Sequence, residues 1–211
     1  GGIPLIAVCE SPFYGLRGLS KRCFDVALAS IGLAIAAPVL LATALGVRLS
    51  SPGPVIFKQR RYGLDGKQIV VYKFRSMSVT EDGRTSFTSA KRNDSRVTRF
   101  GAFIRRTSLD ELPQLFNVLA GSMSIVGPRP LVIATNERYR RLLSGYMVRH
   151  KVKPGITGWA QVNGMRGGDD FASMRRRLDL DLQYLQNWSL SLDMAILLRT
   201  VKLMMGDRHA F

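Results

Sequence analysis

The stretch VALASIGLAIAAPVLLATALGV, residues 26–47, decides the fold because it contains no charged side chain. As a straight helix its 22 residues extend about 33 Å, long enough to cross the hydrocarbon core of a bilayer. Three interpretations fit this length: a helix buried in a soluble core, a helix that spans the membrane, and a helix that enters and leaves the membrane on one face.

Pro38 and the flanking charges favour the third interpretation, a re-entrant membrane helix over residues 20–50. A proline inside a helix removes a backbone hydrogen bond and bends the helix. Basic residues lie on both sides of the apolar run: Lys21 and Arg22 before it, and Arg48, Lys58, Arg60 and Arg61 after it. Basic residues are typical of the cytoplasmic side of a membrane. Because both flanks of the apolar run are basic, we expect both ends of the helix to lie on that side.

The rest of the chain predicts an α+β fold that is mostly helical. β-prone runs on either side of Asp65-Gly66 predict a small β-hairpin. The following helices are amphipathic with arginines on their polar faces, and next to a membrane segment this pattern favours interfacial helices on anionic lipid over a plain solvated surface. These helices are predicted at 97–106, 109–120, 132–144, 170–187 and 191–205.

The chain divides into three predicted regions around the apolar run. Residues 1–19 are interpreted as the tail of a preceding domain or a linker, because an apolar strand with no partner opens the chain. Residues 20–50 form the re-entrant helix. Residues 51–211 form a domain on the cytoplasmic face.

Composition narrows the kind of partner. The 211 residues include 31 Lys and Arg against 15 Asp and Glu, a formal charge of +16, which indicates a polyanionic partner: nucleic acid, anionic lipid or phosphorylated substrates. An apolar fraction of 46% excludes a disordered chain. The two cysteines form neither a CxxC motif nor a disulfide framework, which argues against a zinc module and a secreted disulfide scaffold.

Asp110 and Glu111 are the candidate catalytic pair. Ser108 and Glu111 have capping-box spacing, so a helix is predicted to begin at Ser108. A carboxylate at a helix start among arginines is expected to have a lowered pKa and to stay ionised. The alternative is that neither acid is catalytic and both only stabilise the positive end of the helix dipole.

The surroundings of this pair favour chemistry on phosphates. Arg129 lies between two prolines, and Lys73 and Arg75 follow the predicted hairpin. Carboxylates among cations suit phosphoryl transfer with a divalent metal. Asp110 and Glu111 could bind the metal, or one carboxylate could be the nucleophile. Spacing alone leaves both roles open. Six further cations precede the pair: Lys91, Arg92, Arg96, Arg99, Arg105 and Arg106.

Asp181 is a further candidate in the predicted helix 170–187. It lies three positions before Tyr184, so the two side chains share one helix face. That face either bounds a substrate pocket or faces solvent.

Several motifs in order resemble the bacterial sugar transferase family, the monotopic phosphoglycosyl transferases. The resemblance covers residues 20–211. It rests on KR-FD at 21–25, SPGP at 51–54, YKFRSM at 72–77, SLDELPQLFN at 108–117, MSIVGPRP at 123–130 and KPGITGWAQVNG at 153–164.

The resemblance implies a function. Such enzymes move a sugar-1-phosphate from a UDP-sugar to a polyprenyl phosphate with Mg²⁺ and release UMP; for this chain glucose-1-phosphate and undecaprenyl phosphate are favoured, in exopolysaccharide, capsule or O-antigen assembly. Asp110 would be the nucleophile and Glu111 its assistant, and phosphate would be bound by Arg129, Arg105 and Lys73. The implied location is the cytoplasmic face of the bacterial inner membrane, in contact with its lipid, and a homo-oligomer is compatible with it. Smaller members have Ser-Pro at the membrane kink, where this chain has Ala37-Pro38.

Two alternatives compete with this reading. A membrane-tethered nucleic-acid-binding module would explain the charge, but aromatic residues are not interleaved with the basic clusters as a stacking platform requires. No helix-turn-helix or zinc signature is present either, so we expect no nucleic acid among the partners. A membrane scaffold without catalysis is the other alternative, and in that case Asp110 would be replaceable.

Overall fold

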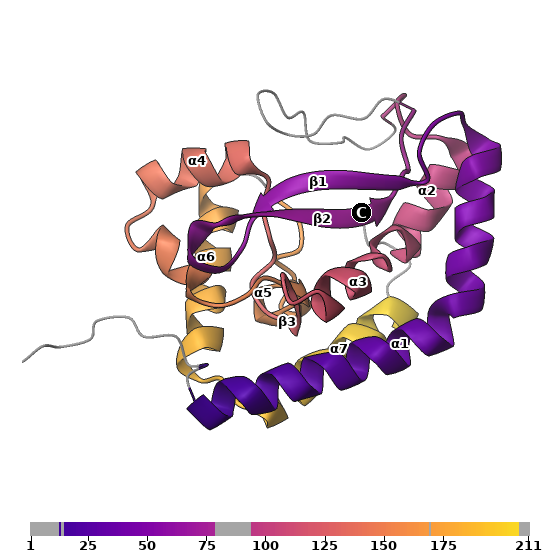
Figure 1. The fold of residues 1–211 in the computed structure, drawn as a ribbon. Helices are drawn as coiled ribbons and strands as arrows, with labels where there is room; N and C mark the ends of the chain where they lie inside the picture. Colours follow the sequence, from indigo (N-terminus) through magenta and orange to yellow (C-terminus); the bar gives the residue numbers. More distant parts are fainter. Residues whose placement is uncertain (1–12, 14, 79–93, 169, 207–211) are drawn as a thin grey trace, which may run out of the picture.

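The computed structural model describes residues 13, 15–78, 94–168 and 170–206. It confirms a mostly helical α+β fold with a small β-hairpin (Figure 1). Most of the predicted tail, residues 1–12 and 14, lies outside the described residues, so the division at residue 19 stays a prediction. Helix α1, Gly15–Ser50, begins five residues before the predicted start at residue 20.

Helix α1 is bent and exposes its apolar surface. Figure 1 shows a sharp turn between two arms. On the first arm Ala29 belongs to the main core cluster, whereas Leu40 and Ala44 on the second arm pack against a separate cluster around Val47. The change of packing partner brackets Pro38, in agreement with the predicted bend. Only 11% of the most apolar window of α1 is buried, which argues against a soluble core helix.

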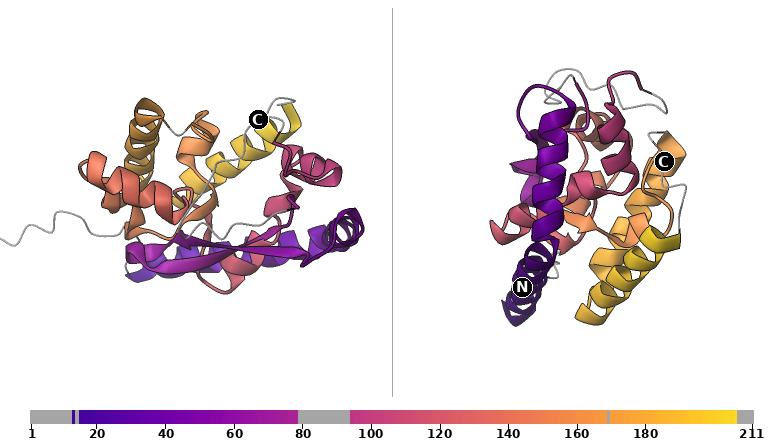
Figure 2. Two further views of the ribbon diagram at one scale, coloured as in Figure 1. Left: turned by 90° about the horizontal axis from the view of Figure 1, so that it is seen from above. Right: turned by 90° about the vertical axis from the view of Figure 1, so that its right-hand side faces the viewer.

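The hairpin consists of β1, Ile56–Tyr62, and β2, Gln68–Phe74, which pair antiparallel from Ile56↔Phe74 to Tyr62↔Gln68. Asp65 and Gly66 in the turn have positive φ angles of 53° and 71°. Seen from above, the hairpin runs along α1, with helices α4, Ile133–Leu142, and α6, Phe171–Gln186, at one end (Figure 2). The hairpin thus bridges the two ends of the molecule.

Short elements connect the hairpin to the C-terminal helices. A two-stranded parallel sheet of β3, Ser124–Val126, and β4, Gly155–Thr157, was not predicted. The remaining elements are the 3₁₀ turns η1 (Leu64–Gly66), η2 (Leu109–Glu111) and η3 (Tyr146–Lys151), and the helices α2 (Arg99–Arg106), α3 (Gln114–Leu119), α5 (Trp159–Val162) and α7 (Leu190–Gly206).

The predicted helix 109–120 is wrong in its first turn. Residues Leu109–Glu111 form the separate turn η2, and α3 starts only after Pro113. The predicted capping box is also absent, because Ser108 adopts a left-handed conformation with φ 57° and its side chain makes no capping bond. The side chain of Glu111 is instead directed to basic residues of other elements, as described below.

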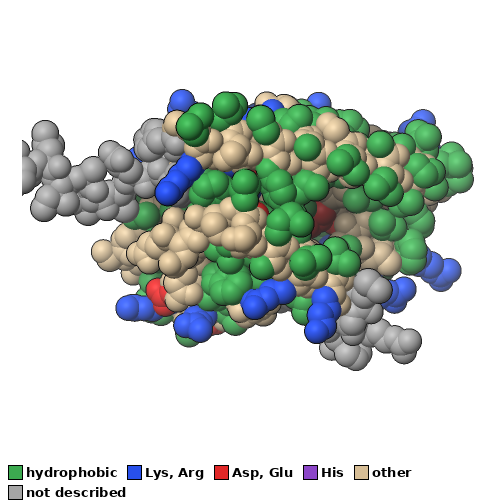
Figure 3. All heavy atoms as spheres, turned by 90° about the horizontal axis from the view of Figure 1, so that it is seen from below, with side chains coloured by type: hydrophobic (Ala, Val, Ile, Leu, Met, Phe, Trp, Pro, Cys, Tyr) green, Lys and Arg blue, Asp and Glu red, His purple; other side chains and the backbone are tan. Residues whose placement is uncertain are grey.

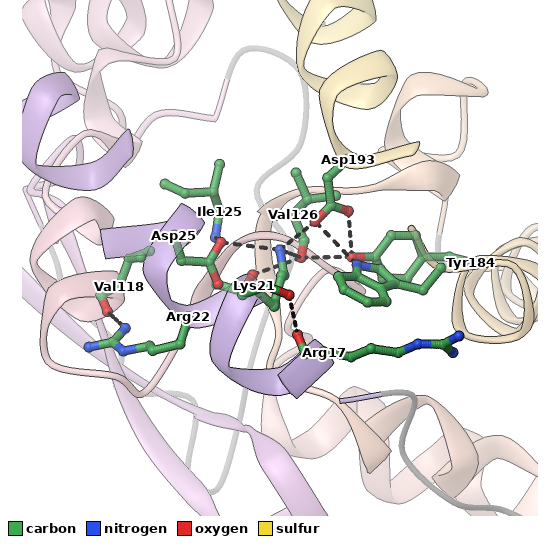
Figure 4. A network of polar contacts seen from close by, with 12 residues as sticks. Arg17, Lys21, Arg22, Asp25, Val118, Ile125, Val126, Tyr184 and Asp193 are labelled. Carbon is green, nitrogen blue, oxygen red and sulfur yellow. Dashed lines mark hydrogen bonds and ion pairs between the residues drawn. The ribbon is translucent and has the colours of Figure 1, made fainter. Parts of the chain in front are cut away.

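A buried polar network fastens the first arm of α1 to the rest of the protein (Figure 4). The Lys21 ammonium lies 3.1 Å from Asp25 Oδ1 and 2.8 Å from Asp193 Oδ2, and it donates to the Val126 carbonyl at 3.1 Å. Arg22 donates to two carbonyls at the end of α3. The two basic residues that were interpreted as a flank of the membrane segment are therefore used inside the protein.

Replacing Lys21 by Met is expected to lower stability by about 3–5 kcal/mol, because two buried carboxylates would lose their shared cation. Thermal unfolding of the purified protein measures the change. Arg17→Met, an exposed position in the same helix, is the matched control and should change stability by less than about 0.5 kcal/mol. Equal melting temperatures for the two variants would contradict the structural role of this network.

Candidate active site

The candidate active site is built around Glu111 in the turn η2. Strand β2 supplies Lys73, and the segment after β3 supplies Arg129. Lys73 Nζ donates to Glu111 Oε1 at 2.7 Å, and Arg129 Nη2 donates to the same oxygen at 2.8 Å. The sequence separations of 38 and 18 residues show that the fold, and not local sequence, assembles this cluster.

Glu111 is held as a carboxylate. Burial alone would raise its pKa, but Arg129 and Lys73 outweigh burial and hold the pKa of Glu111 well below its usual range. In return, Glu111 raises the pKa of Arg129. Burial lowers the pKa of Lys73, although Glu111 opposes that shift. The cluster keeps two cations fixed beside the neighbouring carboxylate, Asp110.

Asp110 differs from Glu111 in both contacts and titration. Within the described part of the chain, its carboxylate has neither a hydrogen bond nor an ion pair. The expected lowering of its pKa is wrong: burial and the adjacent Glu111 raise the pKa of Asp110, against the opposing effects of Lys73, Arg105 and Arg129. The expectation failed because it took no account of burial, which is the largest contribution to the pKa of Asp110 and outweighs the nearby cations. Asp110 is thus the carboxylate left available to a ligand.

Arg105 also faces this site. It lies at the end of α2, and its charge acts on Asp110. Of the other cations predicted before the pair, Lys91 and Arg92 lie outside the described residues, and Arg96 is paired with Asp94 at 2.8 Å. The structure therefore brings together Asp110, Glu111, Lys73, Arg105 and Arg129.

Arg75 does not belong to this group, and its predicted contact with phosphate is wrong. Its side chain donates to the carbonyl of Ser51 at 2.6 Å and to the Ser51 hydroxyl at 3.0 Å. Arg75 is only 4% exposed, so a substrate cannot reach it without local opening. It fastens the turn after α1 to the hairpin.

Asp181 is likewise not on the surface of a substrate pocket. It is 1% exposed and pairs with Arg149 at 2.7 Å. Burial raises the pKa of Asp181, and Arg149 opposes that shift. Helical spacing correctly placed Asp181 and Tyr184 on one face of the helix, but this face lies in the protein interior and neither bounds a pocket nor faces solvent.

Two basic residues near the site were not predicted. Arg166 Nη2 donates to the Ser108 hydroxyl at 3.0 Å and lies 3.9 Å from Glu111 Oε2. Arg61 donates to the Pro130 carbonyl at 2.6 Å, and burial together with Arg129 lowers its pKa to about 9. Both residues are far from Asp110 in sequence, so no spacing rule could have found them.

The donor set fits a divalent cation that brings most of its ligands from elsewhere. No group of three or more His, Cys, Asp or Glu side chains occurs among the described residues. The protein offers the free carboxylate of Asp110 and the less engaged Oε2 of Glu111. Mg²⁺ binds through one or two carboxylates together with water and substrate phosphates, which matches this sparse set.

One face of the molecule is largely apolar. Figure 3 shows hydrophobic side chains over much of the lower face, basic side chains near its edges and an acidic side chain in a hollow. Helices α1 and α7 supply most of the apolar residues. The large exposed ones include Ile31, Ile35, Val39, Leu41, Met194, Leu198, Val201 and Met204.

Paired carboxylates among cations, in a protein with a long exposed apolar helix, are the arrangement that was predicted for a sugar-phosphate transferase. The chain belongs to the bacterial sugar transferase family, whose model matches residues 16–207. The predicted family is thereby confirmed over nearly the whole chain.

Relatives with assigned names agree with this membership. The UDP-glucose:undecaprenyl-phosphate glucose-1-phosphate transferase of Escherichia coli (strain K12) is 55% identical over 201 residues, which are 95% of this chain and 43% of the relative. The protein of the same name from Xanthomonas campestris pv. campestris is 52% identical over 92% of this chain and 40% of its own length. That from Caulobacter vibrioides is 43% identical over 100% of this chain and 76% of its own length. The chain spans less than half the length of the first two relatives.

Proposed function

We propose that this protein transfers glucose-1-phosphate from UDP-glucose to undecaprenyl phosphate, with UMP as the second product. The observation that carries the proposal is the Asp110 carboxylate, which has no hydrogen bond or ion pair to any described residue and lies beside two cations that Glu111 holds in place. The names of the relatives support the donor and the acceptor. We further propose that the reaction occurs at the cytoplasmic face of the bacterial inner membrane, as a step of exopolysaccharide, capsule or O-antigen assembly.

The chemistry is a two-step displacement at phosphorus. A carboxylate oxygen of Asp110 attacks the sugar-linked phosphorus of UDP-glucose, and the bond from that phosphorus to the bridging oxygen breaks, so UMP leaves with the electron pair. A phosphate oxygen of undecaprenyl phosphate then attacks the same phosphorus. The bond to Asp110 breaks, which frees the carboxylate and forms undecaprenyl-diphosphate-glucose.

The basic residues make this attack possible. Lys73 and Arg129 neutralise phosphate oxygens that would otherwise repel the carboxylate, since like charges a few ångströms apart repel strongly in a poorly hydrated site. Glu111 keeps both cations in position. Asp110 and Glu111 would hold Mg²⁺, which supplies further charge neutralisation on the diphosphate when bound.

UMP release tests this function directly. The protein in lipid vesicles is given undecaprenyl phosphate and, in turn, UDP-glucose, UDP-galactose and the two UDP-N-acetylhexosamines. We expect UMP release with UDP-glucose to be fastest and to require the lipid acceptor for multiple turnovers. A faster reaction with another UDP-sugar would overturn the choice of sugar, and no release with any of them would overturn the proposed reaction.

Arg129→Ala is expected to lower kcat/KM by about 2–4 kcal/mol, or roughly 30- to 1000-fold, because one charge-assisted donor to the transferred phosphate is lost. Steady-state UMP release measures this change. Arg138→Ala, an exposed arginine of α4, is the control and should leave kcat/KM unchanged. If the two variants behave alike, Arg129 has only a structural role.

The two ends of α1 are expected to lie on the same side of the membrane, because both arms pack against the same domain. Arg17→Cys and Lys58→Cys place single thiols at exposed positions before and after the bend, in a protein with Cys9 and Cys23 replaced by Ser. A membrane-impermeant thiol reagent in sealed vesicles should label both from one side, and Pro38→Leu should shift part of the label at one position to the other side. Opposite-side labelling of the unaltered helix would overturn the re-entrant topology.

A further inference from the structure

The segment that carries Arg129 is held through its backbone carbonyls. Pro128 and Pro130 have no N–H, so ordinary strand pairing cannot fix this segment from both sides. Four consecutive carbonyls instead accept hydrogen bonds from groups outside the segment. The carbonyl–donor pairs are Pro128 with Gly155 N at 3.0 Å, Arg129 with Arg149 Nη2 at 2.8 Å, Pro130 with Arg61 Nη1 at 2.6 Å and Leu131 with Asn136 Nδ2 at 2.9 Å.

The donor to the Arg129 carbonyl is one half of a fully buried ion pair. Arg149 in η3 and Asp181 in α6 have side chains that are each 2% exposed, with Nη2 2.7 Å and Nε 2.9 Å from Asp181 Oδ2. Arg149 Nη1 also donates to the Tyr146 hydroxyl at 3.3 Å. All three nitrogens of this guanidinium are thus engaged, so its direction is fixed.

Stability alone gives little reason for such a pair. The free energy needed to move two charges out of water is about as large as the attraction gained between them, and a well-packed hydrophobic pair of equal volume is often as stable. A guanidinium that is fixed on one side by a carboxylate can, however, direct a hydrogen bond to a chosen carbonyl. The carbonyl chosen here belongs to the residue whose own side chain reaches Glu111.

We propose that the Arg149–Asp181 pair is a positioning device that aims the Arg129 side chain at the reacting phosphate. The inference rests on the proposed function. It assigns Arg149 and Asp181 no contact with substrate; they act through Arg129.

The backbone around Arg129 explains how one hydrogen bond can have this effect. A residue that precedes proline is confined to extended conformations, so Arg129 has little freedom in ψ. The bond from Arg149 then fixes the plane of the peptide between Arg129 and Pro130. From this backbone the Arg129 guanidinium reaches η2, where it donates to Glu111 Oε1 at 2.8 Å. A small rotation of this peptide would move the guanidinium, at the far end of a long side chain, by much more.

A double-mutant cycle tests the proposal. Arg149→Lys keeps the positive charge, but an ammonium lacks the planar geometry with which the guanidinium donates to both Asp181 and the Arg129 carbonyl. We expect it to lower kcat/KM for UDP-glucose by about 10- to 100-fold, the range for a misplaced catalytic group. In an Arg129→Ala background the same change should have no further effect, within about twofold. Arg22→Lys, which weakens a partly buried arginine–carbonyl contact elsewhere, is the control and should act equally in both backgrounds.

The cycle is repeated on the binding of UDP, measured by calorimetry, because this readout does not depend on turnover. Arg149→Lys should weaken UDP binding only when Arg129 is present. If Arg149→Lys fails to fold, as judged by thermal melting, Asp181→Asn replaces it, since it keeps the side-chain volume and one acceptor oxygen.

The outcomes separate the inference from the proposed function. Losses that are additive in both assays overturn the positioning role and leave the proposed function untouched. Coupling in UDP binding without any UMP release by the unaltered protein supports the positioning role and overturns the reaction. Coupling in both assays supports both.

Discussion

Asp110→Asn is expected to lower kcat for UMP release by at least about 10⁴-fold, the scale seen when a catalytic nucleophile is removed. The amide of Asn is too weak a nucleophile to displace UMP, whereas the ionised carboxylate of Asp110 has no protein partner among the described residues that would compete with the substrate. The fold should survive, because Asn matches Asp in size. Steady-state kinetics and thermal melting of the same preparation measure the two properties.

Glu111→Gln is the matched control for that variant. It removes the charge that holds Lys73 and Arg129, so turnover should be impaired, but the nucleophile remains.

Activity of the unaltered protein should also fall on acidification. Because the pKa of Asp110 is raised by burial, its carboxylate is protonated at a higher pH than an ordinary aspartate, and the fall should begin correspondingly early. Full activity of Asp110→Asn would show that the nucleophile lies elsewhere, with Glu111 the next candidate.

Removal of divalent cations is expected to have the second very large effect, a loss of essentially all turnover in EDTA. In the proposed reaction the carboxylates of Asp110 and Glu111 would approach a diphosphate, while Lys73 and Arg129 are already paired with Glu111. A divalent ion would lower the remaining repulsion between carboxylate and phosphate oxygens. UMP release should return on addition of excess Mg²⁺ or Mn²⁺ but not of Na⁺ at equal ionic strength. Unchanged turnover in EDTA would contradict the proposed metal requirement.

The sequence predicted those parts of the fold that depend on local pattern. The uncharged run 26–47 and Pro38 predicted a bent helix, and the β-prone runs around Asp65-Gly66 predicted the hairpin. The parallel pair β3 and β4 was missed, because each strand has only three residues and its partner lies about 30 residues away. The first turn of 109–120 was wrong because local capping rules took no account of distant cations that bind Glu111.

The same distinction between local pattern and tertiary packing applies to the site. Clusters of charge and family motifs predicted Asp110, Glu111, Lys73, Arg105 and Arg129, and the fold brings these together. The pKa of Asp110 was predicted in the wrong direction, because burial raises it and burial cannot be read from the local sequence. Arg75 and Asp181 were chosen by residue type and spacing, but burial decides their roles, and burial comes from tertiary packing.

The central claim is that Asp110 becomes covalently bound to the phosphosugar, and intact-protein mass spectrometry tests it most directly. The unaltered protein and the Asp110→Asn and Glu111→Gln variants are incubated with UDP-glucose carrying label in the glucose, without undecaprenyl phosphate, and quenched. We predict a labelled adduct of the mass of one phosphoglucosyl group on the unaltered protein and on Glu111→Gln, none on Asp110→Asn, and its disappearance when undecaprenyl phosphate is added. A labelled Asp110→Asn protein, or an unaltered protein that turns over rapidly and never carries the label, would contradict this account.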